Sequence, residues 1–350
     1  MSSKSDIATA IKTAATQVSP EKIMQLGTAF WSSKVFLSAV ELGVFTTLAK
    51  EPMDAETLSK SIGLNDRGSA DFLDCLVSLG VLKRTEGLYS NTPETETYLD
   101  SNNPAYIGGF FEMLNSSSYH SWGELSTVLK TGISKKEIKA AGDDLFEALY
   151  ADPKRLQMFL QAMTGVSRPC ATAIAEKFPW QKYSSFVDVG TAQGGLAVEI
   201  VKKHSHLRGI GFDLHQCESI FEAFTKENQV EKQLTFQAGD FFKQDLPSTD
   251  VLIMGHILHD WNLEQKRMLI AKAHKALSSG GALIVYETMI DDQRKENTFA
   301  LLMSLNMLVK TPGGFDFTPS QLKEWLKEAG FKDITFTKLP ANHTMAVAIK

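Results

Sequence analysis

The sequence predicts an α/β protein with a mostly parallel sheet in its C-terminal half and a mainly α-helical module before it. Short apolar runs alternate with helical patterns from residue 185 onward, as expected for strands covered by helices on both faces of a sheet. Before residue 105, helical patterns are followed by a short hairpin. With 350 residues the chain is also long for one hydrophobic core, so two or more domains are expected.

The composition is that of an ordinary soluble globular protein, with 43% hydrophobic and 22% charged residues. A formal net charge of -5 disfavours nucleic acid or an anionic membrane as a partner. The first residues, MSSKSDIATA, lack a signal-peptide pattern, and no apolar run is long enough to span a membrane, so we expect a cytoplasmic protein. Cys75, Cys170 and Cys217 are far apart and form no CxxC spacing, which favours reduced thiols over disulfides or a zinc site.

Residues 1–105 show the element order of a winged-helix module. Helical patterns over residues 30–42, 55–62 and 72–79 each stop at a glycine, and VLKRTEGLYSNT then predicts two strands around Glu86-Gly87. Winged-helix modules often bind DNA, but this one has nine Lys and Arg against thirteen Asp and Glu. Because DNA affinity depends on neutralised phosphates, we expect packing or dimerisation instead.

The pattern of residues 106–177 predicts packed helices that connect the two domains. The Phe, Met and Leu side chains of these helices are expected either to belong to the hydrophobic core or to line a pocket. In residues 178–350, strands are expected at SFVDVG, GIGFD, LTFQAGD, DVLIMG and ALIVYE, with helices between them. A turn is expected at SSGG, before ALIVYE. DITFTKL and HTMAVAIK predict a final antiparallel hairpin around residues 340–342.

The segment DVGTAQGG joins the first of these strands to a helix, which is where an open parallel sheet binds its ligand. Gly190 and Gly194 lack the GxGxxG spacing of a dinucleotide site. Asp188 could face an ammonium group, Asp213 could accept hydrogen bonds from ribose hydroxyls, and Asp240 in AGDFF could receive an adenine amino group. Each acid alone could cap a helix, but together they point to a nucleoside that carries an amino acid, S-adenosylmethionine.

The ordered set DVGTAQGG, GFDLH, AGDFF, HDW, ALIVYE and PGGFDFT resembles the small-molecule O-methyltransferases of the caffeate and hydroxyindole type. ELGVF, DFLDCLVSLGVL and TPETETYL are similar to that family's winged-helix dimerisation domain. The resemblance covers about residues 25–350 and implies a Rossmann-like class I methyltransferase fold, S-adenosylmethionine as cofactor with S-adenosylhomocysteine as product, and a homodimer. It divides the chain into a dimerisation domain (1–105), a helical connector that contributes to the substrate pocket (106–177) and a methyltransferase domain (178–350).

The resemblance adds Leu214, Phe241 and Trp261 to the expected cofactor contacts, although Trp261 could equally just close a corner of the fold. The family usually has glycine where Ala192 stands. A methyl group at that turn is expected to crowd the methionine tail of the cofactor.

Methyl transfer to a phenol requires a base, because a phenol has a pKa near 10 and is mostly protonated at neutral pH. Histidine suits this task. By the resemblance, His259 of HDW is that base, and Glu287 and Asp316 lie near it and stabilise its protonated form. The alternative is that His259 only fills the corner between strand and helix, where Asn262 and Gln265 have the spacing of a capping box.

His256 is expected not to share a metal ion with His259. Side chains three positions apart on an extended segment point to opposite faces, and Asp260, next to His259, should point away from it. No further ligands are evident nearby, so no metal site is expected.

The expected acceptor is a small aromatic metabolite held by apolar and aromatic side chains. Candidate substrate residues, besides His256, are Met113, Asn115, Tyr119, Trp122, Phe159, Met163, Phe299, Met303 and Met307. The alternatives are C- or N-methylation on the same scaffold, a non-methylating relative that keeps the cofactor, and a DNA-binding regulator that senses a metabolite.

Overall fold

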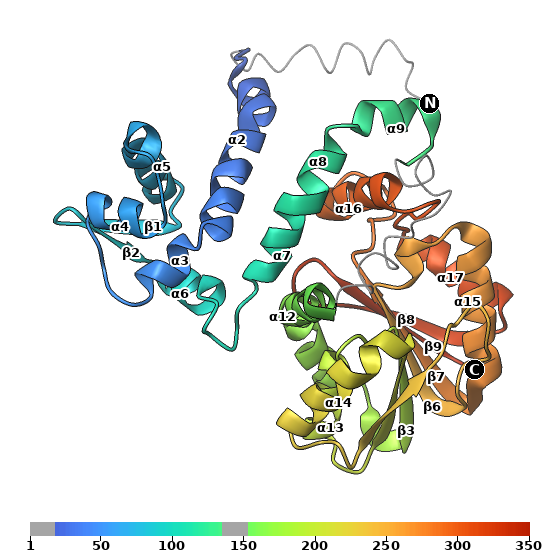
Figure 1. The fold of residues 1–350 in the computed structure, drawn as a ribbon. Helices are drawn as coiled ribbons and strands as arrows, with labels where there is room; N and C mark the ends of the chain where they lie inside the picture. Colours follow the sequence, from blue (N-terminus) through green and yellow to red (C-terminus); the bar gives the residue numbers. More distant parts are fainter. Residues whose placement is uncertain (1–17, 135–152) are drawn as a thin grey trace, which may run out of the picture. The chain divides into compact units, whose positions relative to one another are not determined.

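The computed structural model describes residues 18–134 and 153–350. The chain divides between residues 103 and 104 into two compact units, which are described separately (Figure 1). No helix among the described residues has the length and apolar character needed to cross a membrane.

The first unit consists of helices, a two-stranded hairpin and a final short helix. Its elements are α2 (Glu21–Glu41), α3 (Val44–Leu48), α4 (Ala55–Ser61), α5 (Asp66–Ser78), β1 (Leu82–Thr85), β2 (Leu88–Asn91) and α6 (Pro93–Leu99). The antiparallel hairpin turns at Glu86 and Gly87, whose φ angles of 51° and 85° allow the tight turn. The predicted helices and hairpin of this region are confirmed.

The second unit begins with helices that precede the sheet. These are α7 (Gly108–Met113), a π-helical turn (Leu114–Ser118), α8 (Tyr119–Trp122), α9 (Leu125–Thr131) and α12 (Pro153–Lys177). The sheet and its helices are β3 (Ser185–Val189), α13 (Gly195–Lys203), β4 (Arg208–Asp213), α14 (Glu218–Glu227), β5 (Leu234–Ala238), β6 (Thr249–Gly255), α15 (Leu263–Ala276), β7 (Leu277–Glu287), α16 (Thr298–Lys310), α17 (Pro319–Glu328), β8 (Lys332–Lys338) and β9 (Thr344–Ile349).

The strand order β5-β4-β3-β6-β7-β9-β8 makes one sheet in which β9 alone runs antiparallel to both of its neighbours. The predicted α/β class, mostly parallel with an antiparallel C-terminal end, is confirmed. β3 lies between β4 and β6, so the chain winds outward in two directions from β3. Ligands of open parallel sheets bind at such a switch point, beyond the carboxyl ends of the strands.

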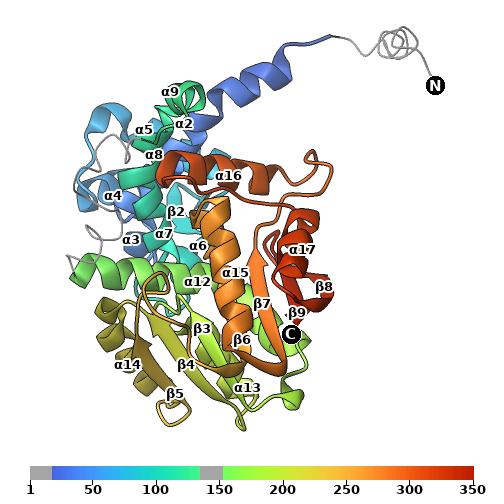
Figure 2. The same ribbon diagram turned by 90° about the vertical axis from the view of Figure 1, so that its right-hand side faces the viewer.

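Successive side chains along each central strand belong to two different hydrophobic clusters, one on each face of the sheet, because side chains of a strand alternate between its faces. Phe186, Ile253 and Ile284 pack with side chains of α12, α13 and α14. Their neighbours Val187 and Leu252 pack with side chains of α15 and α17. Figures 1 and 2 show these two sets of helices on opposite faces of the sheet.

The predicted turn at SSGG is wrong, because β7 already begins at Leu277. Thr249 pairs with Leu277 and Val251 pairs with Ala282, so residues 278–281 form a bulge within the strand. The carboxylate of Asp250 lies opposite this bulge and accepts a hydrogen bond of 3.1 Å from the hydroxyl of Ser278. Asp250 and Ser278 are 28 positions apart in the chain, so this contact cannot be inferred from the residues around SSGG. The two glycines by themselves are typical of a turn.

Candidate active site

Three acidic residues lie at or just beyond the carboxyl ends of neighbouring strands. Asp188 is in β3, Asp213 ends β4, and Asp240 follows β5 by two residues. Because β3, β4 and β5 are adjacent and parallel, the three acids share one edge of the sheet. The predicted set is therefore brought together by the fold.

Asp188 is 5% exposed, and Thr191 donates a hydrogen bond of 2.9 Å to its Oδ2. Burial raises the pKa of its carboxyl from 3.8 to about 7; the hydrogen bond from Thr191 opposes this rise, and the charge of Asp213 makes a smaller contribution to it. No cationic side chain among the described residues lies within ion-pair distance of Asp188. A bound cation would relieve this cost.

Asp213, the last residue of β4, is hydrogen-bonded to the loop of residues 190–194 that follows β3. Its two carboxylate oxygens accept the backbone N–H groups of Ala192 (2.8 Å) and Leu214 (2.7 Å). Burial raises the pKa of Asp213, and these two hydrogen bonds oppose the rise. Each oxygen keeps a lone pair that can accept a ligand hydroxyl.

Ala192 has a φ angle of 54°, in the left-handed region that glycine adopts without strain. A glycine here would adopt the same conformation without a side-chain clash. The residue packs against the apolar cluster of Leu156, Leu160 and Cys217 in this structure. The expected crowding of a cofactor by the Ala192 methyl group stays a prediction.

Asp240 accepts the N–H of Phe242 at 2.8 Å and pairs with Lys243 at 3.1 Å. Burial acts to raise the pKa of Asp240, but these partners outweigh it and lower the pKa. Trp261 meets the rings of Phe242 and Phe241 edge to face, at centroid distances of 4.5 and 5.8 Å. Trp261 thus packs in this corner of the fold, and its expected contact with the cofactor stays a prediction.

His259 lies in a short 3-10 turn (Leu258–Asp260) that follows β6, and it is 7% exposed. Its Nδ1 is 3.7 Å from Oε2 of Glu287 and 3.4 Å from Oδ1 of Asp316. The three residues predicted as catalytic are therefore adjacent, although they come from β6–α15, β7 and the α16–α17 connection. Burial alone lowers the pKa of this imidazole, but Glu287, Asp260 and Asp316 overcome that effect and raise the pKa to about 10.

Glu287 ends β7 with no solvent exposure. Its Oε1 accepts the backbone N–H groups of Leu258 (3.1 Å) and His259 (3.4 Å), so the carboxylate caps the turn that carries the base. Burial raises the pKa of Glu287 to about 7, against the opposing charge of His259.

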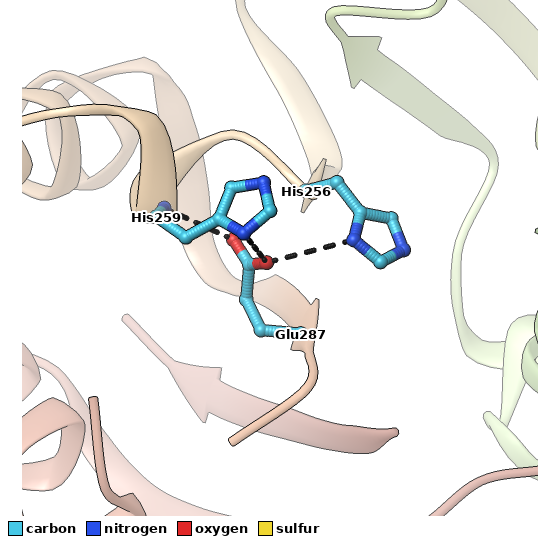
Figure 3. Close-up of side chains that lie close together, drawn as sticks. All are labelled: His256, His259 and Glu287. Atoms are coloured by element: carbon cyan, nitrogen blue, oxygen red, sulfur yellow. Dashed lines mark hydrogen bonds and ion pairs between the residues drawn. The ribbon is translucent and has the colours of Figure 1, made fainter. Parts of the chain in front are cut away.

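The prediction that His256 and His259 face opposite sides is wrong. His256 has a φ angle of 55°, and the chain then enters the 3-10 turn, so the segment is not extended. The two rings lie 5.7 Å apart, and each directs Nδ1 toward Oε2 of Glu287 at 3.7 Å (Figure 3). His256 also contacts the ring of His343, from the β8–β9 hairpin, at 4.9 Å.

Asp260 also departs from expectation, because its Oδ1 lies 3.8 Å from Nε2 of His259. The 3-10 turn brings the side chains of His259 and Asp260 close to each other. That distance is too long for a hydrogen bond, so the effect of Asp260 on His259 is electrostatic.

Lys266 is a residue that the sequence analysis missed. It has no exposed surface, donates a hydrogen bond to the carbonyl of Trp261, and holds its ammonium 3.6 Å from the ring centroid of Phe315. Burial lowers its pKa to about 8. Lys266 occupies an ordinary position in the first turns of α15, so the local pattern offers no reason to expect a buried cation there.

The candidate substrate residues occupy several helices of the second unit. Trp122 on α8 donates from Nε1 to the Asn306 side chain on α16 at 2.9 Å, which joins these two helices. Phe159 packs with Ala192 on the cluster around Cys217. Asn115 and Met307 are 7% exposed, whereas Phe299 is 45% exposed. Met113, Tyr119, Met163 and Met303 are partly buried.

Lys310, at the end of α16, is a second buried lysine that the sequence did not reveal. It is 9% exposed, and its ammonium donates to the hydroxyls of Ser117 (2.7 Å) and Ser121 (3.2 Å). Burial lowers its pKa to about 8.

Comparison with known proteins identifies two family models along the chain. Residues 24–101 match the O-methyltransferase dimerisation domain, and residues 122–332 match the O-methyltransferase domain. Tetracenomycin polyketide synthesis 8-O-methyl transferase TcmO of Streptomyces glaucescens is 41% identical, with 95% of this chain and 97% of TcmO covered. N,N-dimethyltransferase OxyT of Streptomyces rimosus is 33% identical over 89% of this chain and 90% of OxyT.

Among solved structures, human N-acetylserotonin methyltransferase in complex with S-adenosylmethionine superposes with a TM-score of 0.87. It is 28% identical, and the match covers 96% of this chain and 99% of the human chain. The acidic edge fits this cofactor: a buried carboxylate without a cationic partner can face an ammonium, and two further carboxylates can accept hydroxyl or amino hydrogens.

The raised pKa of Asp188 predicts a stability cost at neutral pH in the ligand-free protein. Because the folded chain keeps this proton to about pH 7 and the unfolded chain loses it near 3.8, folding stability falls as pH rises between these values. Asp188→Asn should therefore raise the ligand-free melting temperature at pH 8 by about 5 °C, and the gain should shrink toward pH 5. Thermal unfolding across this pH range measures it.

Asp245→Asn is the matched control, because Asp245 is an exposed acid paired with Lys275 at the surface. It should show no such gain at pH 8. Equal melting temperatures for Asp188→Asn and the unsubstituted protein at every pH would refute the proposed cost.

Proposed function

Because this chain belongs to the O-methyltransferase family and is an S-adenosylmethionine-dependent methyltransferase, we propose that it methylates a hydroxyl of a small aromatic metabolite with His259 as general base. The observation that carries the base assignment is the approach of Glu287 and Asp316 to Nδ1 of His259. The name of TcmO, which refers to polyketide synthesis, supports an acceptor made in secondary metabolism.

The cofactor, when bound, supplies a methyl group on a positively charged sulfur that leaves as a neutral sulfide and needs no proton. In our proposal Asp188 faces the ammonium of the cofactor, Asp213 the ribose hydroxyls and Asp240 the adenine amino group. Gly190, Gly194, Leu214, Phe241 and Trp261 complete the proposed contacts. The positive φ of both glycines, 70° and 89°, lets the backbone make the turn in front of α13.

The acceptor oxygen must lose a proton as it takes up the methyl group. Nε2 of His259 is the proposed destination of that proton, because the carboxylates of Glu287 and Asp316 lie on the Nδ1 side of the ring. Since burial is outweighed by nearby carboxylates, which raise the pKa of His259 to about 10, the proposed base is the neutral form of the ring, whose share grows as the pH rises toward that value. The charge of these carboxylates stabilises the imidazolium that results, in the same way that a buried acid supports the histidine of a catalytic triad. The proton then has to leave before the next turnover.

The acceptor is proposed to lie among the middle helices and α16, where the Met and aromatic residues named above offer an apolar surface. A nitrogen acceptor is the second candidate, because OxyT, at 33% identity, is named an N,N-dimethyltransferase. Product analysis on a panel of phenols and aromatic amines separates the two.

The chain is also proposed to form a homodimer through its first unit. Large apolar side chains of α2 are 55–79% exposed, and these are Ile23, Met24, Leu26, Phe30 and Trp31. A second copy that covers this helix would remove that apolar surface from water.

Trp31→Glu should weaken the dimer, because it places a charge in the surface to be buried. Sedimentation at micromolar concentration should give a dimer for the unsubstituted chain and a larger monomer fraction for the variant. Lys60→Glu serves as the control, because the Lys60 side chain on α4 is exposed. A monomer for all three proteins would contradict the proposed dimer.

Thermal unfolding with S-adenosylhomocysteine tests the cofactor edge without knowledge of the acceptor. At about a hundredfold excess over its dissociation constant, the ligand should add about 2.7 kcal/mol and raise the melting temperature by several degrees. Asp213→Ala should abolish the shift because the ribose acceptor is lost, and Asp245→Ala should keep it. A full shift in Asp213→Ala would show that the cofactor is held elsewhere.

His259→Ala should lower kcat by about 10²–10⁴, the usual contribution of a general base. The variant should retain its shift with S-adenosylhomocysteine, which separates lost chemistry from lost folding. His206→Ala, at the opposite edge of the sheet, should turn over normally. Near-normal turnover in His259→Ala would remove the base assignment and leave methyl transfer itself standing.

A further inference from the structure

His256, His259 and Glu287 bring three ligand atoms to one point. Oε2 of Glu287 is 3.7 Å from Nδ1 of each histidine, and the ligand atoms of the three residues all lie within 4.8 Å of one another. Figure 3 shows both rings turned toward the same carboxylate. This arrangement depends on the positive φ of His256 and is the opposite of the one predicted from the sequence.

Several of the polar atoms at this point are buried and lack hydrogen-bond partners among the described residues. Nδ1 of His259, Oε2 of Glu287 and both carboxylate oxygens of Asp316 have no hydrogen-bond partner among the described residues. The side chains of these three residues are 9%, 1% and 1% exposed. Buried polar atoms normally have partners, so this cluster is built to hold something small and positive.

A proton or a metal ion meets that description, and the donor set suits Zn²⁺. Two imidazole nitrogens and one carboxylate oxygen form a known type of zinc ligand set. Tetrahedral Zn²⁺, with bonds of about 2.0–2.2 Å, separates its ligand atoms by about 3.3–3.6 Å. Oε2 of Glu287 therefore needs to move by only a few tenths of an ångström relative to each Nδ1, whereas the two histidine nitrogens, which lie within 4.8 Å of each other, would approach by up to about 1.5 Å on binding.

The charges around the site also favour a dication. Two carboxylates, Glu287 and Asp316, face the site, and Asp260 lies on the far side of the His259 ring. The cationic Lys266 donates to the Trp261 carbonyl and packs on Phe315.

We propose that His256, His259 and Glu287 form a binding site for a Zn²⁺-class divalent transition metal that reversibly switches off methyl transfer. This inhibitory role rests on the proposed function of His259 as the base. A metal ion that binds Nδ1 of the protonated ring releases the Nδ1 proton to solvent, and the ring keeps its second proton on Nε2. With Nε2 protonated, His259 has no lone pair with which to accept the proton of the acceptor hydroxyl.

Metal binding is measured first, without any acceptor. The full-length chain, dialysed against chelator, is titrated with Zn²⁺ by calorimetry and with Co²⁺ by visible absorption. We expect one ion per chain with micromolar or tighter affinity, and a tetrahedral Co²⁺ spectrum without thiolate charge-transfer bands. His256→Phe should weaken binding at least tenfold, and the exposed His206→Ala should not. The shift with S-adenosylhomocysteine reports whether each variant is folded.

Turnover is measured next, as the ratio of rates with and without Zn²⁺ for each variant. Zn²⁺ should suppress turnover of the unsubstituted enzyme over the range in which it binds, and chelator should restore it. His256→Phe should lose this sensitivity. Absence of binding at 100-fold molar excess, or affinity unchanged in folded His256→Phe, would overturn the site. Binding without inhibition would overturn the switch. Normal turnover in His259→Ala would instead refute the base assignment and leave the measured site intact.

Discussion

The buried carboxylate of Glu287 is the constraint around which the reaction centre is arranged. A carboxylate without solvent needs hydrogen bonds or counter-charge, because burial strongly disfavours its ionised form. Oε1 meets this need through the N–H groups of Leu258 and His259, which shapes the 3-10 turn after β6. Oε2 remains for the two imidazoles. One side chain at the end of β7 thus sets the backbone, the ring orientation and the electrostatics of the proposed base.

Buried or partly buried carboxylates at the ends of β3, β4 and β5 also need hydrogen bonds or a counter-charge. Asp188, Asp213 and Asp240 occupy one edge of the sheet, where the backbone leaves regular pairing and a ligand can approach. Asp213 is stabilised by backbone N–H groups and Asp240 by Lys243, but buried Asp188 has only the Thr191 hydroxyl as a side-chain partner among the described residues. In our proposal the cofactor supplies its missing counter-charge, so the ligand-free fold carries an electrostatic cost that binding removes.

The reaction centre also shows why the identity of a residue does not reveal its chemical state. His259 and His256 have the same side chain and share one carboxylate, yet their pKa values are moved in opposite directions. Three carboxylates approach the His259 ring, whereas His256 is dominated by burial and by neighbouring histidines. Near neutral pH His259 therefore holds a proton and His256 stays neutral, so the proposed base acts in its deprotonated form and a metal ion would have to displace the proton of His259.

Local interactions in the sequence determined much of this protein. Strands and helices alternate as predicted because burial on both sheet faces requires continuous apolar runs, and the Asn262–Gln265 capping box forms because its bonds span three residues. The strand-end acids were also predictable, because parallel strands share a carboxyl edge. Only the tertiary structure decided that His256 turns toward His259, that SSGG is a bulge and that Lys266 is buried. Each of these depends on a partner distant in sequence, namely Glu287, Asp250 and Phe315, and local periodicity carries no information about such contacts.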